Sequence, residues 1–270
     1  MQNCSKDSLA GAKSIRSNAK TAITPVLILC DNSGSMKKYV DIVNQCLVTL
    51  IHDLKAHPVR SHQIDLHIVS FHTDYEDILP FTMVDRIDMS QLKKVEQTEW
   101  ATYLGAALLK AVKELADEKA ALKKARVTYA QPNLIVISDG YPEEEHKDVT
   151  LAGIKAVQDK ITRERWNCIP IFIGHDFKDN IMDEICVPDT NGKKDFIRFD
   201  SMDKKKDIID AFAFASMSID AVGAKTGNTT YTQMSTNELK KKIFEHEKRR
   251  KAIKPNGQQQ KKSFFDSLRF

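Results

Sequence analysis

The strongest constraint on the fold is an apolar run, Ile23–Cys30, which is followed at once by polar residues and then by a helical pattern. Its continuous apolar, β-branched composition predicts a parallel strand that is covered on both faces. From Val40 to Leu54, apolar residues recur at spacings of three and four, which predicts an amphipathic helix. A strand, a polar turn and a helix in this order indicate an α/β domain, in which ligands bind at the carboxyl ends of the strands.

The polar turn carries oxygen-bearing side chains at alternate positions, namely Asp31, Ser33 and Ser35. Alternate side chains of an extended loop point the same way, so these three are expected to converge just beyond the strand. Hard oxygen ligands suit Mg²⁺ or Mn²⁺, which also retain several waters. A plainer alternative is that one serine caps the helix and that Asp31 favours the helix dipole.

Other motifs that begin with an aspartate fit this stretch poorly. An EF-hand loop starting at Asp31 needs Gly at its sixth position and Glu at its twelfth, where this chain has Met36 and Ile42. A dehalogenase-type phosphatase needs a second Asp at position 33 as general acid, and Ser33 does not supply a proton at neutral pH. The G-x-S-x-G nucleophile elbow is absent from this stretch.

The spacing of these residues resembles the D-x-S-x-S signature of the von Willebrand factor A family. The family's threonine, with its following apolar residue and glycine, matches Thr102-Tyr103-Leu104-Gly105, and its strand-end Asp-Gly matches Asp139-Gly140 after the apolar run Asn133–Ser138. Where the family usually has glycines before its threonine, this chain has Trp100 and Ala101. Thr98 is a weaker candidate for the same role because no apolar-x-Gly pattern follows it.

The resemblance implies a metal-ion-dependent adhesion site. Ser33 and Ser35 would bind Mg²⁺ or Mn²⁺ directly, and Thr102 directly or through water. Asp31 and Asp139 would act mostly through waters that they orient. Such a site keeps the ion electrophilic, and it would be completed by an Asp or Glu carboxylate from a protein partner.

The remaining patterns predict alternating strands and helices. We expect an α/β fold with a doubly wound, mostly parallel six-stranded sheet, one antiparallel edge strand and helices on both faces, as in Rossmann-like folds. The antiparallel pair is Ile64–Phe71 with Asp77–Val84, because a five-residue connection is too short for a parallel crossover. Further strands are expected at Asn133–Ser138, Cys168–Gly174 and Phe196–Phe199, and helices at 102–119, Glu143–Arg163, Phe177–Val187 and Lys204–Val222.

Composition and charge divide the 270 residues into four segments. These are a basic flexible leader at 1–20, the von Willebrand factor A domain at 21–222, a Gly/Thr/Asn-rich linker at 223–236 and a basic helical tail at 237–270 that ends in an apolar cluster. The leader carries a net charge of +3 and the tail +7, so residues 21–236 carry −6. Nothing in these segments indicates nucleic-acid binding.

Several features place the chain among cytoplasmic proteins. No stretch approaches the roughly 18 apolar residues of a membrane span, and the leader has no apolar core for secretion. The five cysteines are odd in number and widely spaced, which predicts reduced thiols and a buried Cys30. Five histidines recur at intervals of five, but the run crosses a helix, a loop and a strand, so we interpret the interval as coincidence. They are His52, His57, His62, His67 and His72.

Together these patterns predict a cytoplasmic, non-enzymatic interaction module. The short form of the family that it most resembles is the bacterial TerY type, whose relatives belong to tellurite-resistance, stress-response and phage-defence gene clusters that include kinases and phosphatases. Such an enzyme would be the expected partner, with no membrane contact. The alternatives are a metal-dependent phosphohydrolase that uses Asp31 and Asp139, or a structural subunit whose site is empty.

Overall fold

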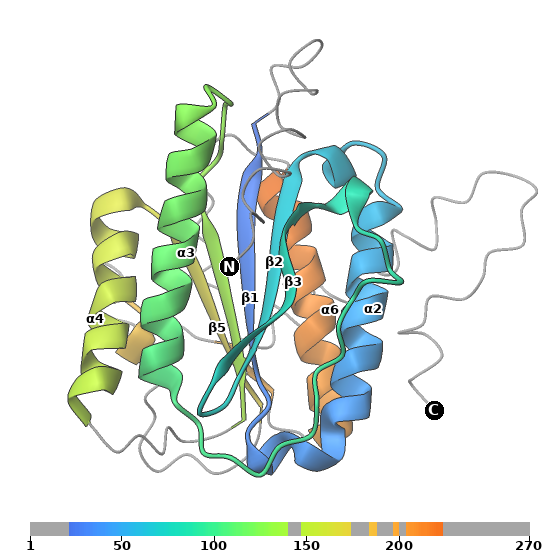
Figure 1. Cartoon of the computed structure of the whole chain (residues 1–270), viewed down its shortest axis with the longest axis vertical. Coiled ribbons are helices and arrows are strands. Elements are labelled where there is room, and N and C mark those ends of the chain that lie inside the picture. The colour runs from blue at the N-terminus through green and yellow to red at the C-terminus, as the bar shows by residue number, and fades with distance from the viewer. Residues whose placement is uncertain (1–21, 140–146, 174–183, 188–196, 200–203, 224–270) are drawn as a thin grey trace, which may run out of the picture.

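The computed structural model describes residues 22–139, 147–173, 184–187, 197–199 and 204–223 (Figure 1). Strands and helices alternate along these residues, as the sequence predicts. The elements are β1 (Thr24–Asp31), η2 (Gly34–Tyr39), α2 (Val40–Lys55), η3 (Arg60–His62), β2 (Ile64–Phe71), β3 (Tyr75–Met83), η4 (Val84–Arg86), α3 (Leu104–Lys124), β4 (Asn133–Ser138), α4 (Lys147–Glu164), β5 (Asn167–Ile173), β6 (Ile197–Phe199) and α6 (Lys204–Gly223).

The strands form one sheet in the order β3-β2-β1-β4-β5-β6. Strand β1 pairs in parallel with both β2 and β4, and β5 pairs in parallel with β4 and β6. Strand β3 is antiparallel to β2, because only His72–Asp74 connects them. The α/β class, the mostly parallel sheet and the antiparallel edge strand are therefore confirmed. The strand order reverses between β1 and β4, so the carboxyl ends of these two strands form the crevice in which such sheets bind ligands.

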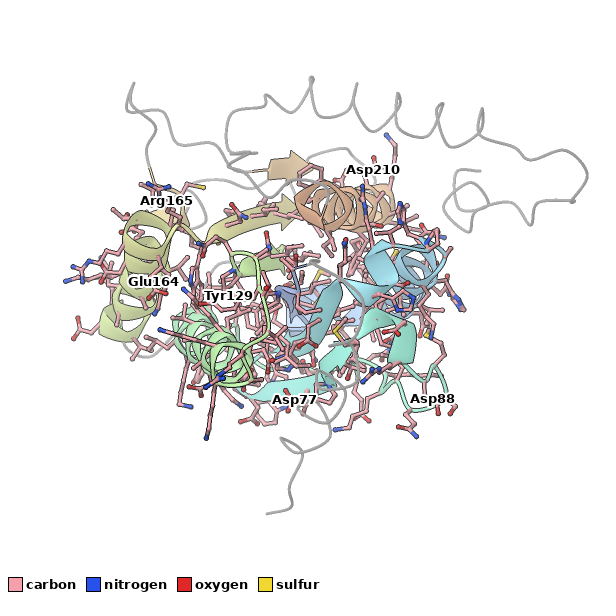
Figure 2. All side chains as sticks on the ribbon, turned by 90° about the horizontal axis from the view of Figure 1, so that it is seen from above. Asp77, Asp88, Tyr129, Glu164, Arg165 and Asp210 are labelled. Carbon is pink, nitrogen blue, oxygen red and sulfur yellow. The ribbon has the colours of Figure 1, made fainter. Side chains whose placement is uncertain are left out.

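Helices cover both faces of the sheet. Helices α2 and α6 lie together on one face, and α3 and α4 lie together on the other, as two perpendicular views show (Figures 1 and 2). Along β1 alternate residues supply the two cores: Val26 and Ile28 pack toward α2 and α6, whereas Leu27 and Leu29 pack toward α3 and α4. Every residue of β1 is buried, which confirms the predicted two-sided burial.

Helices α3 and α4 contact each other closely at two glycines. A Cβ on Gly105 of α3 would lie 2.4 Å from the Cα of Thr150 in α4, and a Cβ on Gly153 would lie 2.4 Å from the carbonyl oxygen of Gly105. Real Cβ atoms do not approach other atoms so closely, so this crossing requires glycine on both helices. Gly105 in the predicted Thr102–Gly105 pattern is thereby explained as a packing residue.

Some element boundaries differ from the predicted ones. The helix expected to open at Thr102 begins at Leu104, because Tyr103 keeps a non-helical backbone and donates its N–H to the carbonyl of His72. Strand β3 begins at Tyr75 rather than Asp77. The leader at 1–20, the linker, the basic tail, Gly140, Glu143–Glu145 and most of the helix predicted at Phe177–Val187 lie outside the described residues.

Candidate metal centre

Asp31 is the last residue of β1, and its carboxylate is buried. One carboxylate oxygen, Oδ1, accepts the backbone N–H of Ser33 at 2.8 Å. The other, Oδ2, accepts the hydroxyl of Ser138 at 2.5 Å. Ser138 ends the neighbouring strand β4, so these two bonds hold the Asp31 side chain in the crevice between the two strand ends.

The two serines of the polar turn continue this contact toward Asp139. The hydroxyl of Ser35 donates to Oδ1 of Asp139 at 2.8 Å, and the Oγ atoms of Ser33 and Ser35 lie 3.2 Å apart. Because the proton of Ser35 is directed to Asp139, Ser33 is the donor between the two hydroxyls. A hydroxyl that donates its proton keeps oxygen lone pairs for a cation. Hydrogen bonds therefore join residues 104 positions apart into one cluster of oxygens.

A segment just before α3 is tied to this cluster through its backbone. The carbonyl of Trp100 accepts the N–H of Gly34, which lies between the two serines, at 3.0 Å. Three residues later, the N–H of Tyr103 donates to the carbonyl of His72 at 3.0 Å. Thr102 lies between these two anchors and is buried, so the segment that carries it lies against the polar turn.

The four other candidate residues are joined more directly than Thr102. Asp31 holds the backbone of Ser33, and the two serine hydroxyls lead to Asp139. The weaker candidate Thr98 has a different role, because its hydroxyl donates to the backbone carbonyl of Asn32 at 2.5 Å and so braces the turn. That these five residues bind a metal stays a prediction.

The donor set fits a hard divalent ion. Two carboxylates and two hydroxyls gather at the carboxyl ends of β1 and β4, with oxygen as the only kind of donor atom. Cys30 is adjacent in sequence, but burial raises the pKa of its thiol, so it stays a neutral core residue. The four described cysteines are free, as predicted, and Cys4 lies outside the described residues.

Near the polar turn, Ser138 and the pair of Lys37 with Glu99 were not singled out from sequence, whereas Trp100 was. Ser138, which bonds Asp31, is recognisable only as the residue before Asp139 at a strand end. Lys37 of η2 forms an ion pair with Glu99, beside the turn. The side chain of Trp100 is 62% exposed, which is the highest value among the large apolar residues that the structure describes.

One member of the histidine run lies in a separate polar cluster. His67 of β2 is buried, and its Nε2 lies 2.8 Å from Oδ1 of Asp77 on β3. Glu114 of α3 approaches the other ring nitrogen and accepts the hydroxyl of Tyr75 at 2.6 Å. The hydrogen bond from His67 is the main reason that the pKa of Asp77 is lowered. The histidines do not form one tract, but His67 has partners that its spacing did not reveal.

A family model of the von Willebrand factor type A domain matches residues 26–211. The chain belongs to this family. The matched residues include the polar turn, the Thr102 segment and Asp139, so the candidate metal centre lies within this VWA domain. A search of curated proteins returns no match.

Solved structures with a similar fold come from diverse proteins. The domain is similar to the pilus adhesin SpaC of Lactobacillus rhamnosus GG at 11% identity, with a TM-score of 0.54, over 75% of this chain and 30% of that one. It is similar to the vWF domain of the type V pili tip protein Mfa5 of Porphyromonas gingivalis at 12% identity, with a TM-score of 0.51, over 78% and 99%. The ArnB paralog VWA2 of Sulfolobus acidocaldarius shares 19% identity over 73% and 46%, with a TM-score of 0.46.

These likenesses concern the fold. The chain spans less than half the length of SpaC and of the ArnB paralog VWA2. Within the described part of the chain, no helix has both the length and the apolar character required to cross a membrane.

Proposed function

We propose that this VWA domain is an interaction module, not an enzyme, and that it recognises an Asp or Glu carboxylate of a protein partner through Mg²⁺ or Mn²⁺ held at the Asp31 site. The observation that carries the proposal is the chain of hydrogen bonds from Asp31 through Ser33 and Ser35 to Asp139. It gathers hard oxygen donors in the crevice where the strand order reverses.

Each residue would have a distinct role at this site. Ser33 and Ser35 would present hydroxyl oxygens directly to the ion, and Thr102 would do so directly or through water. Asp31 and Asp139 would orient bound waters and supply negative charge. When bound, the ion supplies a positive charge for the partner's carboxylate. Ser138 would position Asp31 through their hydrogen bond.

The biological setting is proposed from the sequence resemblance to TerY-type proteins. We place the domain in the cytoplasm, in a stress-response, tellurite-resistance or phage-defence system. Its partner would be a kinase or phosphatase of the same gene cluster that offers an acidic residue.

Metal binding is tested first by thermal unfolding of the full chain in EDTA, Mg²⁺ and Mn²⁺. An ion at 100 times its Kd adds about 2.7 kcal/mol of stability. For a domain of this size that raises Tm by about 5–10 °C. Asp139→Ala should abolish the shift, whereas Asp148→Ala, which removes an exposed carboxylate at the start of α4, should keep it. An unchanged shift in Asp139→Ala would remove Asp139 from the site.

Recognition is tested by selecting a displayed random-peptide library against the chain in Mg²⁺ and, separately, in EDTA. We expect Asp- or Glu-containing peptides to be enriched only in Mg²⁺, and the Asp139→Ala variant to enrich none of them. Enrichment that is equal in EDTA would refute metal-gated recognition. Turnover of p-nitrophenyl phosphate that Asp31→Asn abolishes would favour the phosphohydrolase, and no response to either ion would favour an empty structural site.

A further inference from the structure

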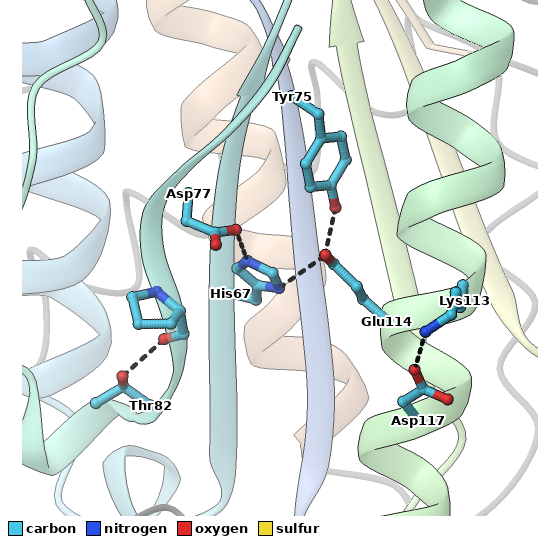
Figure 3. Close-up of polar contacts among 8 residues, drawn as sticks. His67, Tyr75, Asp77, Thr82, Lys113, Glu114 and Asp117 are labelled. Carbon is cyan, nitrogen blue, oxygen red and sulfur yellow. Dashed lines mark hydrogen bonds and ion pairs between the residues drawn. The ribbon is translucent and has the colours of Figure 1, made fainter. Parts of the chain in front are cut away.

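The polar cluster around His67 lies between the β2–β3 hairpin and α3, away from the Asp31 crevice. Donor atoms of His67, Asp77 and Glu114 all lie within 4.8 Å of one another. Figure 3 shows Asp77 at one edge of the imidazole ring and Glu114 at the other, with Tyr75 above Glu114. The β2–β3 hairpin and the helix α3, which is distant from it in sequence, therefore bring a nitrogen ligand and two carboxylates together.

The hydrogen bond at Nε2 determines the role of the other ring nitrogen. Asp77 is a carboxylate acceptor 2.8 Å from Nε2, so Nε2 carries a proton. In the neutral ring, Nδ1 then has a lone pair that faces Oε2 of Glu114 at 3.6 Å. Nδ1 is buried and has no hydrogen bond within the described residues. Two electron-rich atoms thus face each other in a site whose imidazole is only 5% exposed.

The separation of these two atoms suits a shared ion better than a hydrogen bond. An N–H donor to a carboxylate settles at about 2.7–3.2 Å, which is shorter than the observed 3.6 Å. Two ligands that each lie about 2.0–2.2 Å from a tetrahedral zinc ion are about 3.4 Å apart. A cation between Nδ1 and Glu114 would satisfy the nitrogen lone pair and the carboxylate together.

The surrounding groups hold both ligands in place. Tyr75 donates its hydroxyl to Oε2 of Glu114 at 2.6 Å, and the ring of Phe81 packs at a tilt against the ring of His67, 4.7 Å between centroids. A histidine that donates its second nitrogen to a carboxylate is the usual arrangement of a metal-bound imidazole. Lys110 lies 4.0 Å over the ring of Tyr75 rather than between the ligands.

The charge and exposure of the cluster also favour a cation. Two carboxylates, those of Asp77 and Glu114, flank the single imidazole of His67. The side chain of Glu114, whose carboxylate faces Nδ1, is 25% exposed, so this ligand is in contact with solvent.

We propose a second metal site, at which His67 Nδ1 and the carboxylate of Glu114 bind a divalent transition-metal ion such as Zn²⁺, and Asp77 orients the imidazole. A nitrogen ligand selects Zn²⁺ over Mg²⁺, so this site differs in ion preference from the oxygen-only Asp31 site. An ion there would clamp α3 to the β2–β3 hairpin. The proposal does not depend on the function of the Asp31 site.

The test is thermal unfolding of the full chain in saturating Mg²⁺, with and without Zn²⁺. We expect Zn²⁺ to raise Tm further in the wild type and in Asp139→Ala, and to give no rise in His67→Gln or Glu114→Gln. His67→Gln keeps a donor for Asp77 while removing Nδ1, and Glu114→Gln keeps an acceptor for Tyr75, so both retain most of the native contacts. Asp117→Asn, one turn beyond Glu114 and paired with Lys113, is the matched control and should respond as the wild type does (Figure 3).

Affinity provides a second readout. Asp77→Asn should weaken Zn²⁺ binding by about 10–100-fold in calorimetric titration, since loss of a carboxylate that orients a metal-bound histidine has that effect. If His67→Gln or Glu114→Gln fails to fold, the remaining one of these two variants decides the outcome. A Zn²⁺ response in both His67→Gln and Glu114→Gln that equals the wild-type response, or no Zn²⁺ response at all, would overturn the proposal.

Discussion

Replacing Gly105 by alanine tests the close contact between α3 and α4. The new Cβ would lie 2.4 Å from the Cα of Thr150 and 2.5 Å from the carbonyl oxygen of Val149. Both are backbone atoms of α4, so no side-chain rotation relieves the clash and the helices must move apart. Overpacking of this kind costs about 1–3 kcal/mol, and the backbone contact places this case at the upper end.

A second effect opposes the clash. Alanine within a helix is about 1 kcal/mol more favourable than glycine. The expected net loss for Gly105→Ala is therefore about 2 kcal/mol. For a domain of this size that corresponds to a fall in Tm of about 4–8 °C.

Urea unfolding followed by circular dichroism measures this loss, with an unchanged m-value showing that the unfolding transition is otherwise the same. Ala106→Gly is the control, because residue 106 is exposed on the same turn and should report the helix-propensity difference alone, about 1 kcal/mol. Gly153→Ala fills the same contact from α4, so the double variant should lose less than the two single losses added together. A Gly105→Ala variant as stable as the wild type would refute the close crossing of α3 and α4.

Two other perturbations address charge and site geometry. Lys119 and Lys160 hold the pKa of Glu164 at about 2, below its ordinary 4.5. These ion pairs therefore stabilise the fold above about pH 4.5, and that stability is lost as the pH falls toward 2. Glu164→Gln should thus lower Tm at neutral pH and change it little near pH 2, and an equal loss at both would contradict this. Mn²⁺ bound at the Asp31 site should quench the fluorescence of Trp100, which is exposed and bonded to the polar turn, but not that of the buried Trp166. Trp100→Phe should therefore remove most of the quenching. Equal quenching in that variant would show that the ion binds elsewhere.

The positions of the polar turn and of Asp139 could be predicted because the ends of strands can be recognised in the sequence. Long apolar runs identify β1 and β4, and parallel strands bring their carboxyl ends to one edge of the sheet. Asp31 and Asp139 each lie at such an end, and the observed pairing of β1 with β4 brings them together through Ser35.

The start of α3 could not be predicted in the same way. Local pattern places a helix from Thr102, but the N–H of Tyr103 bonds to the carbonyl of His72, which is distant in sequence. Tertiary hydrogen bonding therefore overrides local preference for two residues. The non-helical backbone of Tyr103, which this contact with His72 accompanies, accounts for the later start.

The His67 cluster was hidden for a similar reason. Its partners lie 10 residues away on β3 and 47 residues away on α3, and nothing in the spacing of the histidines points to either. The sequence did contain a weak signal of a buried polar cluster, because Tyr75, Asp77 and Glu114 are polar residues in elements that have a buried face. It becomes specific only when the sheet order and the helix placement are known.

Helix α3 runs unbroken from Leu104 to Lys124 and joins the surroundings of both sites. Its first turn follows directly from the Thr102 segment, and Glu114 lies ten residues further along, about 15 Å at the rise of an α-helix. The contact between Gly105 and Gly153 prevents α3 from moving closer to α4 near the start of the helix. Any tilting of α3 would therefore turn about this contact. An ion bound to Glu114 would change the free energy required to displace the Thr102 segment. By thermodynamic linkage, a ligand bound at the Asp31 crevice would change the free energy of ion binding at Glu114 by the same amount.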